Sequence, residues 1–570
     1  MKSAGCSILL VSTWLTGMLA TSGCRPTNQP NVILVSIDTL RADHVSVYGY
    51  PRNVSPAIDR LARQGTQFIN AHSNAPWTLP SHWSMLTGLY PSHHGVLIDH
   101  HKGSWTTPTM AELLSEAGYR TAAFVGGGYV SKDWNLDRGF HIFQSHGREF
   151  AQNMPPAVSY ITSAGRDKPF FVFIHSFDVH NPFISPYPYG NLFVENDQSH
   201  FIDHRAIPCY SSLNGAADLN FYLDEYNGCL RHADSYIDLL LRTLKEKDLL
   251  DRTILIVTAD HGEEFMDHGA FDHSFLSLFE PDIGIPLIVR GPGIPAGKLA
   301  GKPVQSVDIL PWLLAYLGIP GPERLDGTDL FAPDNPDSDV VLSENLFFRQ
   351  LLLDIEVECL FDNSLHYWCG TVRASDPSST IRESVEREFA GSFFKVEWET
   401  ETTCLIASQA LSFRMKLEEP HATQACIVLL ESWEGAENTE MHDRLLASFA
   451  LGSEPFVPEV RDWNLVTTSG CVFALPTGYF IRRASDTRAI RNSRWTLIVD
   501  QSTGAMHLYD RATDPNEMFD VAASHPDIAR DMAQRMSELI KNSSSGHFGT
   551  LEGISDHTIE ELQSLGYVGG

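Results

Sequence analysis

The chain has 570 residues, which is long enough for a large catalytic domain together with a smaller second domain. Its 71 acidic residues outnumber the 41 lysines and arginines, so the formal net charge is -30 at pH 7. This charge argues against nucleic acid or an anionic membrane surface as a partner. An anionic substrate would therefore need a local positive site, which a bound metal ion supplies.

The first 24 residues have the pattern of a secretory signal peptide. Lys2 precedes an apolar stretch over residues 8–20 that is too short for a confident membrane span. Residues 21–24, Thr-Ser-Gly-Cys, resemble a bacterial lipoprotein cleavage box. The sequence therefore predicts export to the periplasm or outer membrane, with a lipid anchor at Cys24 as the only contact with a membrane. The alternative is an ordinary signal peptide that contains a cysteine. Residues 25–30 read as a polar linker.

Three nearly continuous apolar runs have the composition of strands that are buried on both faces, namely residues 31–37, 169–174 and 253–259. Asp38 follows the first run, His175 follows the second, and Asp260 and His261 follow the third. Because ligands of open α/β sheets bind at the carboxyl ends of the strands, these side chains are candidates for one site. For each aspartate alone, a helix cap or a turn residue is the more common explanation.

Helical patterns alternate with these strands. Ser55 and Pro56 mark a helix start with Gly65 at its end, residues 107–118 repeat the pattern, and residues 224–247 are expected to form a long amphipathic helix. Further strands are expected at residues 119–125, 285–290 and 340–342. The alternation predicts an α/β fold with a mostly parallel central sheet flanked by helices on both faces.

Thr78 lies in the segment Ala-Pro-Trp-Thr-Leu-Pro-Ser-His, residues 75–82, at an expected helix start. Pro80 suits the first helical turn, where free N–H groups attract anions. A hydroxyl at that place becomes a nucleophile if a cation lowers its pKa. The same residues also make an ordinary helix cap, so the motif alone does not decide between the two interpretations.

Together these motifs resemble the sulfatase family of the alkaline phosphatase superfamily. The family places a metal-binding aspartate where Asp38 stands, a Cys/Ser-x-Pro-x-Arg motif where residues 78–82 stand, and an Asp-Asn pair where Asp260 and His261 stand. Residues 90–96 and 565–569 are also typical of the family. The resemblance implies an alkaline phosphatase-like fold with a catalytic domain over residues 31–345 and a C-terminal subdomain, built on a small antiparallel sheet and a terminal helix, over residues 481–570.

Residues 346–480 read as a divergent insert or extension. Apolar and polar residues tend to alternate here, which favours antiparallel strands. The chain has seven cysteines beyond Cys6 and Cys24, and their spacing matches no zinc pattern. Cys209 with Cys229, and Cys359 with Cys369, are candidate disulfides, although the sequence does not fix any pairing.

The departures from the family pattern change the expected chemistry. Thr78 is neither the Cys nor the Ser that relatives convert to formylglycine, so no formylglycine is expected. His82 replaces the motif arginine, and Thr39 replaces the second aspartate of an Asp-Asp pair. With His261 as an imidazole ligand, zinc or manganese fits better than calcium, although all three stay open.

The resemblance implies a divalent metal ion held by Asp38, Thr78, Asp260 and His261. Thr78 is the expected nucleophile, His82 and His180 are further catalytic candidates, and His180 and His273 are candidates for binding the ester group. Glu263 reads as a solvated loop acid or as part of the site, and Asp178 or His273 would have to serve any second metal.

Two functions remain open at this point. The first is a metal-dependent hydrolase of sulfate, phosphate or phosphonate esters on small molecules or glycans, acting through a covalent Thr78 intermediate. The second is a surface lipoprotein that kept the fold, lost catalysis and binds a glycan or a protein partner. The four retained residues Asp38, Thr78, Asp260 and His261 favour the enzyme. The sequence leaves the natural substrate and the oligomeric state open.

Overall fold

A computed structural model describes residues 29–97, 101–164, 168–193, 218–346 except 270, 274–276 and 334–339, and 487–564 except 502–503, 542–548 and 551–554. Between residues 353 and 473 it describes eight separate strands. The expected signal peptide, Cys24, the linker up to residue 28 and residues 565–569 lie outside the described residues. No helix among those that are described is long and apolar enough to cross a membrane.

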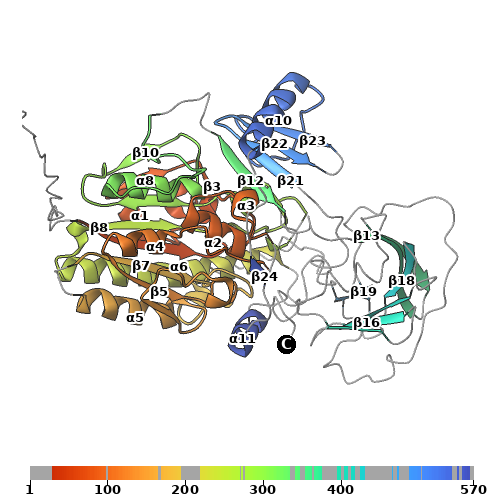
Figure 1. The fold of residues 1–570 in the computed structure, drawn as a ribbon, viewed down its shortest axis with the longest axis horizontal. Helices are drawn as coiled ribbons and strands as arrows, with labels where there is room; N and C mark the ends of the chain where they lie inside the picture. The colour runs from red at the N-terminus through yellow and green to blue at the C-terminus, as the bar shows by residue number, and fades with distance from the viewer. Residues whose placement is uncertain are drawn as a thin grey trace, which may run out of the picture.

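The central sheet has eight strands in the order β10-β2-β9-β8-β1-β7-β5-β6 (Figure 1). In chain order they are β1 (Asn31–Ile37), β2 (Thr66–Phe68), β5 (Arg120–Val125), β6 (Ile142–Ser145), β7 (Phe170–Ser176), β8 (Thr253–Thr258), β9 (Leu287–Arg290) and β10 (Lys298–Ala300). Only β9 runs antiparallel to its two neighbours, β2 and β8. All other pairs are parallel, which confirms the predicted mostly parallel sheet.

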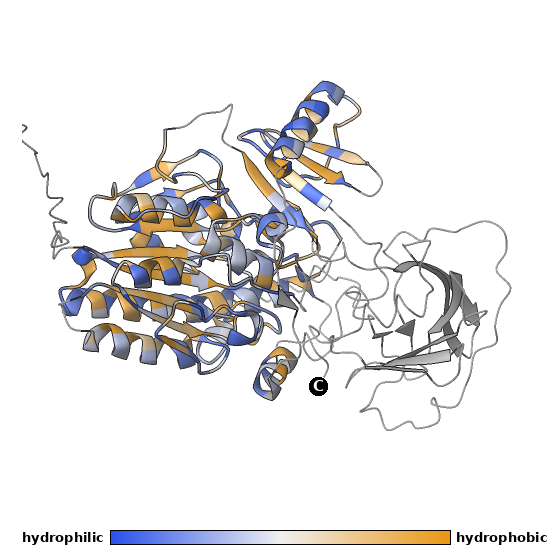
Figure 2. Ribbon diagram, in the orientation of Figure 1, coloured by the Kyte–Doolittle hydropathy of each residue, from blue (hydrophilic) through white to orange (hydrophobic). Residues whose placement is uncertain are grey.

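The strands β1, β7 and β8 lie side by side in the middle of the sheet and are buried along their whole length. Burial on both faces explains why their sequences are continuous apolar runs without polar alternation. Figure 2 shows these strands as hydrophobic, whereas the outer helices carry both hydrophilic and hydrophobic residues. The parallel arrangement brings the carboxyl ends of the three strands to one edge of the sheet.

Two groups of helices flank the sheet. In the first, α1 (Pro56–Arg63) and α5 (Phe150–Ser163) both contact α6 (Leu219–Glu246); in the second, α4 (Met110–Glu116) and α8 (Ile309–Leu317) both contact α2 (Thr78–Thr87). The helix α6 begins five residues before the predicted start at residue 224. Its cap is Asp218, whose Oδ1 accepts a hydrogen bond from the Asn220 N–H at 3.0 Å.

A smaller antiparallel sheet, in the order β12-β21-β22-β23, lies apart from the central sheet (Figure 1). Its strands are β12 (Val341–Asn345), β21 (Thr487–Arg491), β22 (Trp495–Asp500) and β23 (Met506–Asp510), and α10 (Pro526–Ile540) packs against them. The predicted strand near residue 340 was wrongly assigned to the parallel sheet. β12 instead pairs with β21, because its apolar residues join the core of the smaller sheet.

The described strands between residues 353 and 473 pair antiparallel throughout, as the alternating sequence predicts. They are β13 (Leu353–Asp362), β14 (Leu365–Ala374), β15 (Lys395–Trp398), β16 (Thr403–Ala407), β17 (Ser412–Lys416), β18 (Gln424–Leu429), β19 (Leu465–Val466) and β20 (Val472–Phe473). The remaining short elements are β3 (Ala71–His72), β4 (His101–Lys102), β11 (Val304–Gln305), β24 (Gly549–Thr550), α3 (Pro91–His94), α7 (Glu280–Ile283) and α11 (Asp556–Ser564).

The structure corrects one of the two candidate disulfides. Cys229 is a free thiol that is buried in the main hydrophobic core on α6, so the pairing of Cys209 with Cys229 is wrong. Cys209 itself lies outside the described residues. Cys359 lies opposite Trp368 and Cys369 lies opposite Glu358 in the β13–β14 hairpin, so the second pairing stays a prediction.

Candidate metal and nucleophile site

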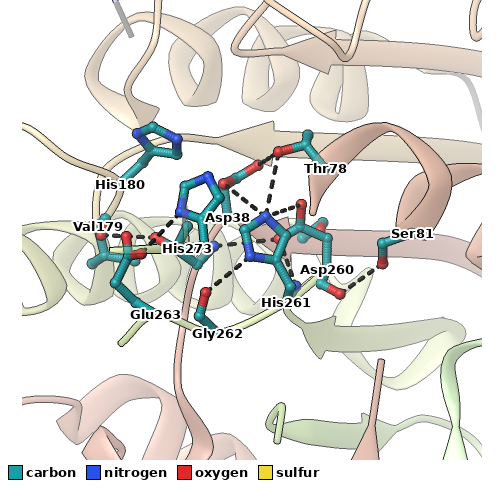
Figure 3. Close-up of polar contacts among 12 residues, drawn as sticks. Asp38, Thr78, Ser81, Val179, His180, Asp260, His261, Gly262, Glu263 and His273 are labelled. Carbon is teal, nitrogen blue, oxygen red and sulfur yellow. Dashed lines mark hydrogen bonds and ion pairs between the residues drawn. The ribbon is translucent and has the colours of Figure 1, made fainter. Parts of the chain in front are cut away.

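Four predicted site residues meet at the carboxyl edge of the central sheet (Figure 3). Asp38 follows β1, Asp260 and His261 follow β8, and Thr78 is the first residue of α2. Thr78 Oγ1 lies 3.3 Å from Asp38 Oδ2 and 3.4 Å from His261 Nε2. His261 Nε2 also lies 3.8 Å from Asp38 Oδ1 and 3.5 Å from Asp260 Oδ2. All four side chains are fully buried.

The turn after β1 fixes the direction of Asp38. Thr39 adopts a left-handed backbone with φ of 55°, which is uncommon for a β-branched residue. Its hydroxyl donates to Val179 O at 2.8 Å, and its N–H donates to Asp260 Oδ1 at 3.3 Å. The Thr39 side chain therefore points toward the backbone of the loop that follows β7. Its own N–H ties the turn after β1 to the turn after β8.

These four residues fit a divalent cation. Ligands about 2.0–2.2 Å from one metal ion lie roughly 3–4 Å from each other, and the distances given above fall in that range. Asp38 Oδ1 and Asp260 Oδ2 are buried and accept no hydrogen bond from any described residue. His261 Nδ1 lies 2.9 Å from Gly262 O, which turns Nε2 toward both carboxylates. Burial of a carboxylate without such a partner is costly, and a cation removes that cost.

The electrostatics of these four residues also favour a bound cation. Burial raises the pKa of Asp38 to about 8, and burial together with the neighbouring Asp38 raises the pKa of Asp260 to about 6. Burial also lowers the pKa of His261 to about 4, so its imidazole is neutral near pH 7. A neutral imidazole is a competent metal ligand, and a bound divalent cation favours the ionised form of both carboxyl groups.

A second group of ligand-type residues, Glu149, Asp178 and His232, lies close together near the start of α5. Here both oxygens of Asp178 are already used. Oδ1 lies 2.9 Å from His232 Nδ1, and Oδ2 accepts from the Phe150 N–H at 2.7 Å and from the Ser176 hydroxyl. Asp178 therefore acts as a cap and ion-pair partner at α5, and the sequence-based idea that it serves a second metal gains no support from this geometry.

His82 lies on α2, one helical turn after Thr78. Its Nδ1 lies 2.8 Å from Thr78 O and 3.5 Å from Asp260 Oδ2, and its Nε2 lies 3.2 Å from Ser36 Oγ. Burial lowers the pKa of His82 to about 4. These contacts favour a role in positioning Thr78 and Asp260 over direct contact with a substrate.

His180 and His273 lie on the other side of His261 (Figure 3). The ring centroids of His273 and His180 are 5.0 Å apart, and those of His273 and His261 are 4.7 Å apart. Both side chains are buried, and burial lowers the pKa of each. The structure thus brings both predicted ester-binding histidines next to a predicted metal ligand.

Two buried residues contribute more than their sequence positions indicate. Glu263 is fully buried, with Oε1 2.9 Å from His273 Nδ1, so its reading as a solvated loop acid is wrong. His175 Nε2 lies 3.2 Å from Asp38 Oδ2. The only sequence signal for His175 was its place at the end of a buried strand, directly before the motif that contains His180.

Comparisons with known proteins identify the family. Residues 30–319, just over half of the chain, match the family model described as Sulfatase. The chain is a member of the sulfatase family. It is 27% identical over 364 residues to arylsulfatase K of Homo sapiens, covering 54% of this chain and 66% of that protein. It is 26% identical over 350 residues to the extracellular sulfatase SULF-1 homolog of Drosophila melanogaster, covering 53% of this chain but 31% of that protein.

Solved structures with the same fold include sulfatases and a phosphonate hydrolase. The phosphonate monoester hydrolase of Agrobacterium radiobacter superposes with a TM-score of 0.56 at 17% identity, covering 92% of this chain and 97% of that chain. A structure solved in complex with its substrate D-glucosamine-2-N,6-O-disulfate gives a TM-score of 0.56 at 16% identity, covering 90% and 98% of the two chains. These likenesses confirm the alkaline phosphatase-like fold.

Proposed function

We propose that this sulfatase-family protein is a metal-dependent hydrolase of sulfate, phosphate or phosphonate esters that uses Thr78 as its nucleophile. The observation that carries the proposal is the position of the Thr78 hydroxyl, within 3.4 Å of both Asp38 and His261, beside two carboxylate oxygens that accept no hydrogen bond from a described residue. A protein that had lost catalysis would have no need to keep these buried carboxylates together, and this arrangement disfavours a purely binding role.

The chain's own residues divide the chemistry as follows. A metal ion bound by Asp38, Thr78, Asp260 and His261 would act as a Lewis acid, lowering the pKa of the hydroxyl and neutralising charge on the transferred group. Asp38 Oδ2, 3.3 Å from Thr78 Oγ1, orients the hydroxyl and accepts its hydrogen bond. Thr78 is the first residue of α2, so the helix dipole favours an anionic substrate group at its hydroxyl.

The reaction then proceeds in two displacements. Thr78 Oγ1 gives up its proton by way of Asp38 Oδ2 and forms a bond to phosphorus or sulfur while the bond to the leaving oxygen breaks. The leaving oxygen departs as an anion and takes a proton from water, and the neutral rings of His180 and His273 would bind the transferred group. Water next attacks the covalent Thr78 ester, the bond to Oγ1 breaks, and the hydroxyl regains its proton. No step requires formylglycine, because Thr78 itself carries the nucleophilic oxygen.

The substrate class of this proposal is a small-molecule or glycan ester. A panel of aryl sulfate, phosphate diester and phosphonate monoester substrates, each assayed with zinc, manganese or calcium, tests it directly. Turnover of at least one ester that depends on stoichiometric metal supports the hydrolase. A protein that binds no metal and turns over none of the panel would contradict it and leave the binding function.

We further propose that the protein is exported and anchored at Cys24, from the lipoprotein-like segment before residue 25. Expression of the full chain in a bacterium, followed by metabolic labelling with a fatty-acid analogue, tests this. Label is expected on the wild-type protein and should be absent from Cys24→Ala. Labelling that persists in the variant would place the lipid elsewhere.

A further inference from the structure

The C-terminal helix α11 is docked onto the central domain, well away from α10 (Figure 1). Leu562 is fully buried in the main hydrophobic core. Ser555 Oγ donates to Asp133 Oδ2 at 2.9 Å, and Thr558 Oγ1 donates to the same oxygen at 2.5 Å. Asp133 belongs to the segment that follows β5, so α11 is tied to a loop at the carboxyl edge of the central sheet.

Glu561 of α11 holds the glycine turn at the start of that loop. Its Oε2 accepts a hydrogen bond from the Gly128 N–H at 3.0 Å, and its Oε1 accepts one from Ser145 Oγ at 2.5 Å. Gly127 has φ of +82°, and a Cβ added there would lie 2.1 Å from the Glu561 carboxyl carbon. Only glycine permits this backbone conformation together with such a close approach. The Glu561 carboxylate therefore packs directly against the backbone of the Gly126–Gly128 turn.

The same turn reaches the metal site through His175. The Gly126 N–H donates to His175 Nδ1 at 3.3 Å, and His175 Nε2 lies 3.2 Å from Asp38 Oδ2. Because Nδ1 accepts from the backbone, the neutral ring carries its proton on Nε2 and donates it to Asp38. The orientation of Asp38 thus depends on where the turn places the Gly126 N–H.

The loop reaches the nucleophile as well. The ring of Tyr129 lies 5.4 Å from the ring of Trp77 in an edge-to-face arrangement, and also packs against Trp134 at 5.1 Å. Trp77 is the N-cap of α2, directly before Thr78. One loop, tied to α11, therefore contacts both His175, which donates to Asp38, and Trp77, which directly precedes Thr78.

Resting on the proposed function, we propose that Glu561 is a positioning residue for the metal and nucleophile site. Its carboxylate holds the Gly126–Gly128 turn so that His175 donates to Asp38 and Tyr129 supports Trp77. Partners that orient a metal ligand change metal affinity by about 10–100-fold when removed, and small displacements of reacting groups cost large factors in rate. We therefore expect the loss of Glu561 to lower both the metal affinity and the reaction rate through this turn.

The test compares Glu561→Ala and Glu561→Gln with Glu538→Ala, an exposed glutamate on α10 that does not contact the loop. In the metal-free protein, amide hydrogen exchange over residues 126–128 should become about 10-fold faster in Glu561→Ala, because the Gly128 N–H loses its acceptor. Metal affinity, measured by competition with a chelator, should fall about 10-fold, with kcat falling more than KM changes. Glu561→Gln keeps an acceptor and should fall in between, and Glu538→Ala should match the wild type.

Coupling to His175 separates positioning from general stability. In the His175→Asn background, Glu561→Ala should cause little further loss of metal affinity, since the route to Asp38 is already broken. Unchanged exchange in the turn would overturn the proposal, and so would faster exchange with unchanged metal affinity and kcat. If the wild type binds metal but hydrolyses no ester, the proposed function fails, while exchange and metal affinity still decide the role of Glu561.

Discussion

His175 Nε2 lies 3.2 Å from Asp38 Oδ2, and both side chains are fully buried at the ends of the neighbouring strands β7 and β1. Burial lowers the pKa of His175 to about 3, so the ring is neutral and acts as a hydrogen-bond donor through Nε2. This contact leaves Asp38 Oδ1 on the side of Asp260 and His261. The pair therefore decides which oxygen of Asp38 is presented to a cation.

Removing this donor should weaken metal binding without removing a ligand. His175→Ala is expected to lower metal affinity by about 10–100-fold, as for other residues that orient a metal ligand. The measurement is a chelator competition titration, with the exposed His146→Ala as the control. Affinity equal to the wild type would show that Asp38 keeps its orientation without His175.

Asp260 is predicted to be a metal ligand, so its loss should abolish metal binding and activity together. Asp260→Ala should retain less than about a tenth of the bound metal after purification, because one of two buried carboxylates is gone. Elemental analysis of the purified protein provides the measurement. Asp251→Ala is the control. Asp251 is exposed and precedes β8, at the opposite end of the strand from Asp260, so this variant should keep full metal occupancy. Metal content that is equal in the two variants would remove Asp260 from the ligand set.

The site at the carboxyl edge of the central sheet could be predicted from the sequence, because each strand and the residue that follows it form one short continuous segment. Three apolar runs mark β1, β7 and β8, and parallel pairing forces Asp38 and Asp260 to one edge. The direction of β9 was not predictable, since an apolar run of four residues carries no sign of its orientation. β12 was misplaced for a related reason: its pairing with β21 joins residues about 150 positions apart.

Burial of polar residues was the least predictable part of the site. Glu263 follows a glycine and stands among acidic neighbours, a pattern typical of a solvated loop, yet it is fully buried against His273. The sequence makes His82 a catalytic candidate because it replaces an arginine in the motif, yet its ring nitrogens contact Thr78 O, Asp260 and Ser36. Such assignments depend on side-chain direction, which spacing along the chain does not determine.

Thr78 should be essential through its hydroxyl. Thr78→Ala is expected to reduce kcat by on the order of 10³-fold or more with the fold intact, whereas Thr78→Ser should keep measurable turnover because the hydroxyl remains. Circular dichroism and thermal unfolding serve as the control for folding. If Thr78→Ala turned over substrate at the wild-type rate, water would be the direct nucleophile.

Glu280 links the central domain to the smaller sheet and should make that contact sensitive to acid. Burial alone would raise its pKa, but His72, Arg511 and Arg491 outweigh burial and hold the pKa well below the ordinary value of 4.5. Glu280 Oε2 lies 3.0 Å from His72 Nε2 and 3.4 Å from an Arg511 guanidinium nitrogen. Because the folded pKa is lowered, the unfolded state binds the proton more tightly, and stability is lost as the pH falls below about 4.5.

Glu280→Gln should therefore lower the unfolding midpoint at pH 7, and the difference from wild type should shrink as the pH falls toward 3. Thermal unfolding recorded across this pH range checks the prediction, with the exposed Glu323→Gln as the control. A difference that stays constant with pH would mean that the charge of Glu280 does not stabilise the contact.

If Thr78 is the nucleophile, as proposed, its chemistry determines the preferred ester. A formylglycine hydrate releases sulfate by elimination, but a Thr78 ester has no such route and must be attacked by water. A phosphate monoester carries about two negative charges near neutral pH and a sulfate monoester carries one, and metal-activated water is suited to clearing a phosphoryl group. We expect phosphate or phosphonate esters to outpace sulfate esters in side-by-side kinetics on metal-replete protein. Intact-mass analysis should find Thr78 unmodified, and faster turnover of sulfate esters in the same preparation would refute the preference.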